Sequence, residues 1–421
     1  MDMKHVKYLA LVLCIGNLSP VMAQTASKSL TVDNLVAWQR ISGQAISDNG
    51  KWVACKMEPW EGDAVVNLYD AQGKELATFP RADRFLFSAS SDYLVVSQKP
   101  GKMIVDSLKI KKTKKEKMPM DALVIYSLSG GREVIDSLKT FRLAEQADWL
   151  AFQKGRKDST LYVRPLNGKL STRYEAPAVK AFNFVEKSGM LYYITAGDKA
   201  KDKPGLYLLN TETGVKTLIK EGDGVFKQVT FDEDGANLAF LYCAQKDSCY
   251  KAMSLWLSQQ GAPATEVAAR GNRAFPKGWV ISEHGKLQFS KSASRLFFGT
   301  SPEPRQKDTL QLAENRPNVQ VWSWDEPVQY TVQDYNKEKE LKRSYQAVYH
   351  INGGRICQLA DEELSQILLG DEGDAPLALL STSRPYSLSS MWEGRTRSDY
   401  YTVSMEDGSR KLLASADYGR Y

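Results

Sequence analysis

Short apolar runs separated by polar turns recur along most of the chain. Five segments share one arrangement, in which an apolar anchor is followed by a polar turn and then by a second apolar run. They are Ala45–Met57, Phe87–Gln98, Phe184–Thr195, Phe231–Tyr242 and Phe289–Thr300. In "FDEDGANLAFLY" a turn around Gly235 precedes the run Leu238–Tyr242. Runs of this length, bounded by Gly, Asp, Asn and Ser, predict a strand, a turn and a buried strand.

A second pattern is a hairpin, in which an aromatic-containing strand, a Gly-rich or polar turn and another strand follow one another. Eight such hairpins are predicted, and their aromatic landmarks are mostly 36 to 66 residues apart. The landmarks are Tyr69, Tyr126, Tyr162, Tyr207, Trp256, Trp322, Tyr349 and Tyr401. One turn-plus-strand segment and one hairpin make a four-stranded antiparallel unit of about 40–50 residues, the period of a β-propeller blade.

The predicted fold class is therefore all-β, a β-propeller of about seven or eight four-stranded blades over residues 44–421. One small sheet cannot bury both of its faces, whereas stacked blades can. Helix signals are scarce. Thr31–Trp38 predicts a short helix in an N-terminal segment, 24–43, and Asn336–Arg343 predicts a second short, polar helix.

The N-terminus has the pattern of a signal peptide, residues 1–23. Lys4 and Lys7 precede the apolar run Tyr8–Ile15, and Ala23 supplies the small residue before a cleavage site. The run is much shorter than the roughly 20 residues of a membrane span. The expected location is therefore periplasmic or secreted, with no membrane association after cleavage.

The composition is that of a globular protein, with 43% hydrophobic and 25% charged residues and a net charge of +6. Six lysines gather between Lys109 and Lys117. We interpret this stretch as a solvated loop between two strands; the alternative is a patch for anionic partners. Nucleic acid is not an expected partner of an exported protein.

Export permits disulfides, and Cys243 and Cys249 flank a five-residue polar segment inside a predicted hairpin. They are a candidate disulfide, with two free thiols as the alternative. Cys55 and Cys357 lie far apart in the sequence, and nothing local pairs them. No Cys/His cluster has metal-ligand spacing, so no metal and no cofactor is expected.

Catalytic signals are weak. Beyond the signal peptide the only histidines are His284, in a turn, and His350, in a strand, and neither is expected to be a catalytic base. The acids of Asp371–Asp374 could bind a metal or an amine, but we interpret them as an acidic turn between two blade strands. The sequence contains no G-x-S-x-G elbow for a nucleophilic serine.

The order of several segments resembles the propeller region of secreted bacterial serine peptidases of the prolyl oligopeptidase family (S9). The segments are Leu30–Ala54, Met118–Leu128, Val319–Pro327, Lys342–Leu364, Ile367–Leu379 and Arg384–Leu413. The resemblance covers essentially the whole chain after the signal peptide. It implies a propeller joined to an α/β-hydrolase domain that carries a Ser-Asp-His triad. These residues contain no such triad, and no catalytic residue is carried over.

The expected function is the non-catalytic propeller portion of an exported S9-like serine peptidase, which gates peptide access to a hydrolase domain absent from this sequence. Its partners would be a peptide substrate and that hydrolase domain, and the chain alone would not be active. The alternative is a stand-alone periplasmic β-propeller that binds a protein or a peptide. A weaker alternative, a sugar-directed enzyme, needs paired carboxylates in the central channel. The last hairpin ends near Tyr421, so an incomplete or open propeller is expected.

Overall fold

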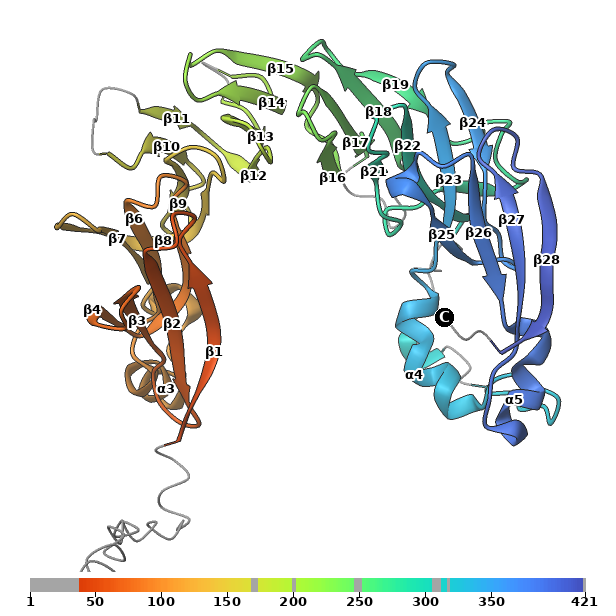
Figure 1. Ribbon diagram of the computed structural model, residues 1–421, viewed down its shortest axis with the longest axis horizontal. Coiled ribbons are helices and arrows are strands. Elements are labelled where there is room, and N and C mark those ends of the chain that lie inside the picture. The colour runs from red at the N-terminus through yellow and green to blue at the C-terminus, as the bar shows by residue number, and fades with distance from the viewer. Residues whose placement is uncertain are drawn as a thin grey trace, which may run out of the picture.

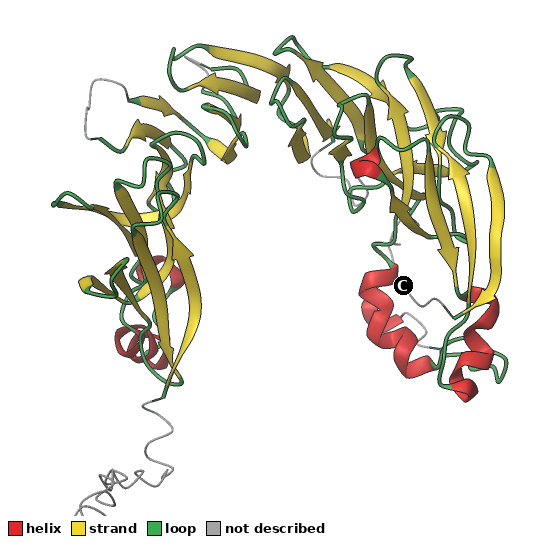
Figure 2. Cartoon of the chain, in the orientation of Figure 1, coloured by secondary structure: helices red, strands yellow, loops and turns green. Residues whose placement is uncertain are grey.

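A computed structural model describes residues 38–167, 173–198, 202–245, 252–304, 312–315 and 319–418. Strands dominate these residues, and the few helices lie at the ends of the assembly (Figure 2). The strands form six antiparallel sheets, and within each sheet the strands follow one another in chain order except around β21. This arrangement confirms the predicted all-β fold built of propeller-type blades.

Five of the sheets are single blades. Blade 1 has β1 (Gln39–Ile46), β2 (Trp52–Pro59), β3 (Val65–Asp70) and β4 (Glu75–Pro80). Blade 4 has β12 (Val179–Phe184), β13 (Met190–Thr195), β14 (Gly205–Asn210) and β15 (Lys216–Glu221). Blade 5 has β16 (Val225–Phe231), β17 (Asn237–Cys243), β18 (Ser254–Gln259) and β19 (Thr265–Ala268).

The last two single blades have longer connections. Blade 6 has β20 (Trp279–Ile281), β21 (Gln288–Phe289), β22 (Arg295–Pro302), β23 (Tyr345–His350) and β24 (Arg355–Gln358). Blade 7 has β25 (Gln366–Leu369), β26 (Leu377–Thr382), β27 (Ser398–Ser404) and β28 (Arg410–Asp417). In blade 6 the first strand is split, because β20 and β21 pair with opposite ends of β22.

The remaining sheet has seven strands and contains two blades. Its strands are β5 (Ala82–Phe87), β6 (Tyr93–Gln98), β7 (Asp121–Ser127), β8 (Arg132–Leu143), β9 (Trp149–Lys154), β10 (Leu161–Pro165) and β11 (Tyr174–Ala176). The long β8 pairs with β7 up to Leu138 and with β9 from Leu138 onward. Its first half closes blade 2 and its second half opens blade 3. The described residues therefore form seven blades, within the predicted seven or eight.

The five turn-plus-strand segments coincide with the first two strands of blades 1, 2, 4, 5 and 6. In blade 5 the turn after Phe231 is held by Asp232, whose carboxylate accepts hydrogen bonds from the backbone and side chain of Asn237 at 3.0 and 2.6 Å. The second strand, β17, is buried from Leu238 to Cys243. The segment that looked acidic in sequence is therefore a turn.

Seven of the eight predicted hairpins are present, and one prediction is wrong. Val319–Val332 forms no strand; it is irregular up to Gln329 and then enters α4 (Tyr330–Glu340). Trp322 stacks on Tyr330, with ring centroids 4.3 Å apart, rather than on a neighbouring strand. The segment belongs to the long connection between β22 and β23. Its aromatic alternation resembled a strand, but β23 takes the place beside β22.

The helices correct two further predictions. The lysine-rich stretch is not all loop: α3 (Lys102–Ile110) and a 3-10 turn, η1 (Lys115–Lys117), occupy much of it. The helix predicted at Asn336–Arg343 exists as α4 but begins at Tyr330. One further helix, α5 (Ser387–Glu393), was not predicted, and neither were three 3-10 turns, η2 (Ala313–Asn315), η3 (Asp371–Gly373) and η4 (Arg384–Tyr386).

Other predictions lie outside what the structure describes. The signal peptide and all but the last residue of the predicted helix Thr31–Trp38 are among the undescribed residues, so both stay predictions. The first strand begins at Gln39, inside the predicted N-terminal segment 24–43. Among the described helices, none has the length and apolar character needed to cross a bilayer.

Each pair of neighbouring blades encloses its own apolar cluster. Between blades 4 and 5, for example, Leu206 and Leu208 pack against Leu238 and Phe240. Equivalent clusters lie between blades 1 and 2, 2 and 3, 3 and 4, 5 and 6, and 6 and 7. Alternating residues of a strand point to opposite faces, so each interior blade contributes to two clusters. This sharing of faces is the physical reason for the repeat.

The turns after the first strand also link neighbouring blades. The Asn49 amide donates to Ser91 Oγ at 3.2 Å between blades 1 and 2, and the Ser90 amide donates to Asp148 at 3.0 Å between blades 2 and 3. The blades form an open arc in Figure 1, with β1 at one end and β28 at the other. This arc agrees with the predicted open propeller, and whether the ring is incomplete stays a prediction.

Candidate functional site

A pocket of about 670 Å³ lies where the first strands and turns of blades 5, 6 and 7 meet, and the turn after the first strand of blade 4 also lines it. We call it the inner-rim pocket. Its lining residues are Glu186, Lys187, Phe231, Asp232, Glu233, Gln288, Phe289, Ser290, Lys291, Gln346, Ile367, Leu368, Leu369 and Glu372. The volume falls in the range of small-ligand sites. Three of the contributing strands, β16, β21 and β25, are edge strands of their sheets.

Ion pairs across the blade boundaries hold the rim of this pocket. Lys187 Nζ lies 2.5 Å from Glu233, and Lys291 Nζ lies 3.0 Å from Glu372. The hydrogen bond from Lys187 lowers the pKa of Glu233, and the one to Glu372 raises the pKa of Lys291. Glu233 and Lys291 therefore stay charged near neutral pH. The rim therefore carries both signs of charge.

The turn Asp371–Asp374 closes one side of the pocket. Asp374 accepts hydrogen bonds from the amide and hydroxyl of Ser292 at 2.7 and 2.6 Å. Burial alone would raise the pKa of Asp374, but hydrogen bonds from Ser292 and Ser290 lower it. Gly373 has a φ of 96°, and a Cβ there would lie 2.6 Å from the Phe297 ring. The turn fixes blade 7 against blade 6, and it lies between two blade strands as predicted.

One residue of the lining carries an unsatisfied polar group. The side-chain amide nitrogen of Gln346, on β23, is buried and has no hydrogen-bond partner within the described structure. Its backbone carbonyl accepts from the amides of Leu359 and Ala360, both at 3.0 Å. A buried donor without an acceptor is costly and rare in folded proteins. Gln346 could not be predicted as a site residue from the sequence, because a polar residue inside a strand usually faces solvent.

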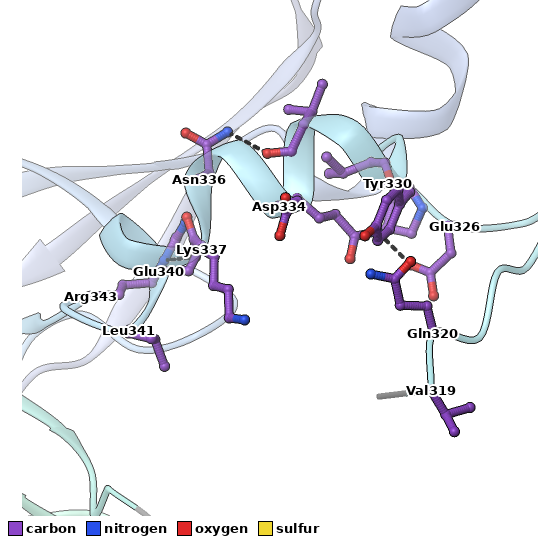
Figure 3. Close-up of a pocket in the computed structure, with 14 residues that line it drawn as sticks. Val319, Gln320, Glu326, Tyr330, Asp334, Asn336, Lys337, Glu340, Leu341 and Arg343 are labelled. Carbon is purple, nitrogen blue, oxygen red and sulfur yellow. Dashed lines mark hydrogen bonds and ion pairs between the residues drawn. The ribbon is translucent and has the colours of Figure 1, made fainter. Parts of the chain in front are cut away.

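A second pocket, of about 830 Å³, lies between the irregular segment 319–328 and α4. Figure 3 shows Asn336, Glu340 and Arg343 along the α4 side and Val319 and Gln320 on the other. Arg343 donates two hydrogen bonds to Glu340, at 2.7 and 2.5 Å. The hydrogen bond from Arg343 lowers the pKa of Glu340. The segment mistaken for a hairpin is therefore one wall of this pocket.

A third pocket, of about 430 Å³, shares Glu340 and Arg343 with the second and also includes Lys339, Lys342 and His284. His284 lies in the turn between β20 and β21, as predicted. His350 lies on β23, and its Nε2 is 2.9 Å from the Met405 carbonyl of blade 7. The two histidines thus occupy separate places, and His350 links two blades.

The predicted disulfide stays a prediction, because Cys249 lies outside the described residues. Cys243 is buried at the end of β17, with its sulfur 3.6 Å from the Gln245 carbonyl. Cys55 lies in blade 1 and Cys357 in blade 6, and burial raises the pKa of the Cys357 thiol. Within the described ranges, no group of three or more His, Cys, Asp or Glu side chains is arranged to hold a metal ion.

No family model and no curated protein matches the chain. A structure of the eukaryotic initiation factor matches at 10% identity and a TM-score of 0.46, over 90% of this chain and 77% of that one. A prolyl endopeptidase matches at 11% identity and 0.37, over 87% of this chain and 47% of that one. The β-propeller domain of the Trilobed protease from Pyrococcus furiosus matches at 10% identity and 0.35, over 91% and 100%.

These likenesses are distant. The chain spans about half the length of the prolyl endopeptidase that it resembles, at 47% of that chain. Identities near 10% and TM-scores below 0.5 carry no argument about substrate or activity. The blade architecture itself rests on the strand pairing described above.

Proposed function

We propose that this chain is the non-catalytic propeller of an exported S9-like serine peptidase, and that it controls peptide access to a hydrolase domain supplied by other residues. The ordered resemblance supports this proposal, because all of its segments except Val319–Pro327 supply strands of blades 1, 2, 6 and 7 in chain order. The observation that carries it is the inner-rim pocket, a peptide-sized hollow bordered by strand edges from three successive blades.

The proposal assigns peptide binding to the blades and hydrolysis to a separate domain for a chemical reason. Peptide hydrolysis by this family needs a serine nucleophile oriented by a histidine base. His350 is engaged with a backbone carbonyl, and His284 lies in a charged surface pocket. The blades would therefore bind and orient a peptide, and the triad would come from a hydrolase domain in the same polypeptide or in a separate one.

The test is an activity assay of the purified chain with proline-containing chromogenic peptides, with and without a fluorophosphonate serine probe. We expect neither turnover nor labelling from the chain alone, and turnover when the hydrolase domain is supplied. Turnover by the chain alone that the probe abolishes would contradict the proposal. The DNA that flanks the coding sequence gives an independent check, since it should encode a G-x-S-x-G elbow.

A second candidate is a stand-alone propeller that binds a protein or a peptide. Exposed tryptophans favour it: Trp324, beside α4, is 92% exposed, and Trp392, on α5, is 87% exposed. Both helices lie at the same end of the arc, below blades 6 and 7 (Figure 1). Exposed aromatic side chains are enriched at protein interfaces. An unrelated gene downstream, in place of a hydrolase, would favour this candidate over the first.

A further inference from the structure

The inner-rim pocket is bordered by unpaired backbone. In the part of the chain that the structure describes, β16 pairs only with β17, β21 only with β22, and β25 only with β26. Each of these strands therefore presents one row of N–H and C=O groups without a strand partner. Such an edge is a template for an added strand.

The side chains of the pocket suit an extended chain of moderate polarity. Phe231, Phe289, Ile367 and Leu369 are half-buried and supply apolar contacts. Side chains of an added strand alternate in direction, so every second one would meet this surface. Small apolar residues at alternate positions are therefore the expected sequence preference.

The charges of the rim restrict the ligand further. Lys187 is paired with Glu233 and Lys291 with Glu372, so both cations already have carboxylate partners. Glu186 and Asp232 add two more negative groups to the lining. A strongly anionic ligand such as nucleic acid would face these carboxylates. The lining holds four carboxylates and two lysines, so it disfavours an anionic segment and accepts a neutral or cationic one.

The unsatisfied amide of Gln346 points to the kind of atom that the ligand supplies. A buried N–H donor that lacks a partner gains most from an acceptor that enters with a ligand. Backbone carbonyls are the acceptors that an extended peptide carries at every residue. Strand addition combined with one side-chain donor is a recurring mode of peptide recognition.

We propose that the inner-rim pocket binds an extended peptide segment without negative charge by strand addition to the free edge of β25 or β21, with the Gln346 amide donating to one of its backbone carbonyls. This inference rests on the proposed function, because the segment would belong to the peptide that the propeller admits. It adds the site, the binding mode and the class of segment.

The first experiment uses a fluorescent, capped hexapeptide of alternating valine and threonine as the probe, titrated into the full chain. Two isomers, N-methylated at every second residue in opposite registers, are the controls. One register removes the donors that face the strand edge, and the other removes those that face solvent. We expect binding to fall by about tenfold or more for one isomer only. Equal behaviour of the two isomers, or no binding of the parent peptide, would overturn strand addition.

The second experiment tests Gln346. The substitution Gln346→Leu should weaken probe binding by about tenfold while the thermal midpoint stays unchanged or rises, since a buried unpaired amide is replaced by an apolar group of similar size. Gln72→Leu, at an exposed turn of blade 1, is the matched control and should change neither quantity. Unchanged binding by Gln346→Leu, or binding lost together with stability, would contradict the assigned role.

The outcomes separate this inference from the proposed function. If the probe does not bind but the chain still supports peptidase activity of a supplied hydrolase domain, the pocket assignment fails and the proposed function stands. If the chain alone hydrolyses peptides, the proposed function fails whatever the probe does. If the probe only dissociates a dimer, the edge is occupied by a second copy of the chain, and the peptide assignment is wrong.

Discussion

The six interfaces between blades bury their apolar side chains, whereas the two outer faces of the arc leave theirs exposed. The alternation of residues along the strands is the same in both. Inside the array, Ala54 and Leu68 of blade 1 face blade 2 and are fully buried. On the other face of the same sheet, Ile41 is 59% exposed and Ile46 is 67% exposed. The blades at the ends of the arc thus have two apolar faces, as interior blades do, but only one of these faces is covered by a neighbouring blade.

Blade 7 repeats this asymmetry. Ala378 and Leu380 pack on blade 6, whereas Leu377 and Leu379 alternate with them and point away. Leu368 pairs with Leu379 and extends this free face. Whether an apolar side chain of a blade is buried therefore depends on whether another blade packs against that face, and not on the residue pattern of the strand. Apolar sheet faces without a neighbour favour association.

The largest expected effect concerns an interior interface. Phe240→Ala should cost about 3–5 kcal/mol of unfolding free energy, because the side chain is fully buried and packs beside Phe226 and Trp256. Ile46→Ala, on the free face of blade 1, should cost less than about 0.5 kcal/mol. Urea unfolding followed by tryptophan fluorescence measures both. Similar losses for the two variants would remove the distinction between interior and outer faces.

Self-association is the next effect in size. The wild-type chain should associate as its concentration rises, and the double variant Ile46→Lys, Leu377→Lys should shift it to monomer with little change in thermal midpoint. Sedimentation velocity over a concentration series measures this, with Glu75→Lys as a charge-changing control at an exposed position. A wild-type chain that is monomeric at every concentration would show that the outer faces are covered.

A smaller effect should appear in acid. Because the hydrogen bonds to Asp374 lower its pKa in the folded chain, its contribution to stability is present above the unfolded pKa of about 4 and is lost as the pH falls below it. Asp374→Asn should cost under about 1 kcal/mol at pH 7, and the cost should become smaller as the pH falls toward 2. Thermal midpoints of both proteins from pH 7 to pH 2 measure this. A cost that is constant with pH would contradict the assigned charge.

The smallest effect should come from the exposed ion pair of the rim. Lys187→Ala should leave the thermal midpoint unchanged within error, because exposed pairs are screened by solvent and salt. Differential scanning calorimetry at low and high salt measures it. A clear drop in the thermal midpoint at low salt that disappears at high salt would mean that this ion pair helps to hold blades 4 and 5 together.

The sequence allowed much of the fold to be predicted. Turn residues such as Asp232 and Gly235 act locally, so the strand–turn–strand units could be recognised without tertiary information. The hairpin of blade 3 was predicted from Tyr162, but its turn-plus-strand part was not, because the first strand of this blade is the second half of β8, which blade 2 also uses. The hairpin predicted at Val319–Val332 was wrong although its local sequence alternates as a strand does. The position beside β22 is taken by β23, so this segment has no strand to pair with there.

Less of the candidate site could be predicted. The inner-rim pocket joins β16, β21 and β25, which are remote in sequence, and its volume depends on how three blades are inclined. The unsatisfied amide of Gln346 is visible only when the surrounding atoms are placed. The acidic turn Asp371–Asp374 was recognised as a turn, but its bond to Ser292 of the preceding blade had no signal in the sequence.

Hydrogen exchange of the backbone amides, with and without the valine–threonine hexapeptide, tests the central claim most directly. If the peptide adds as a strand at the inner rim, amides of Gln366–Leu369 or of Gln288–Phe289 gain protection, and amides of the outer strand β28 do not. Protection confined to other blades, or none at saturating peptide, would contradict a peptide site at the inner rim.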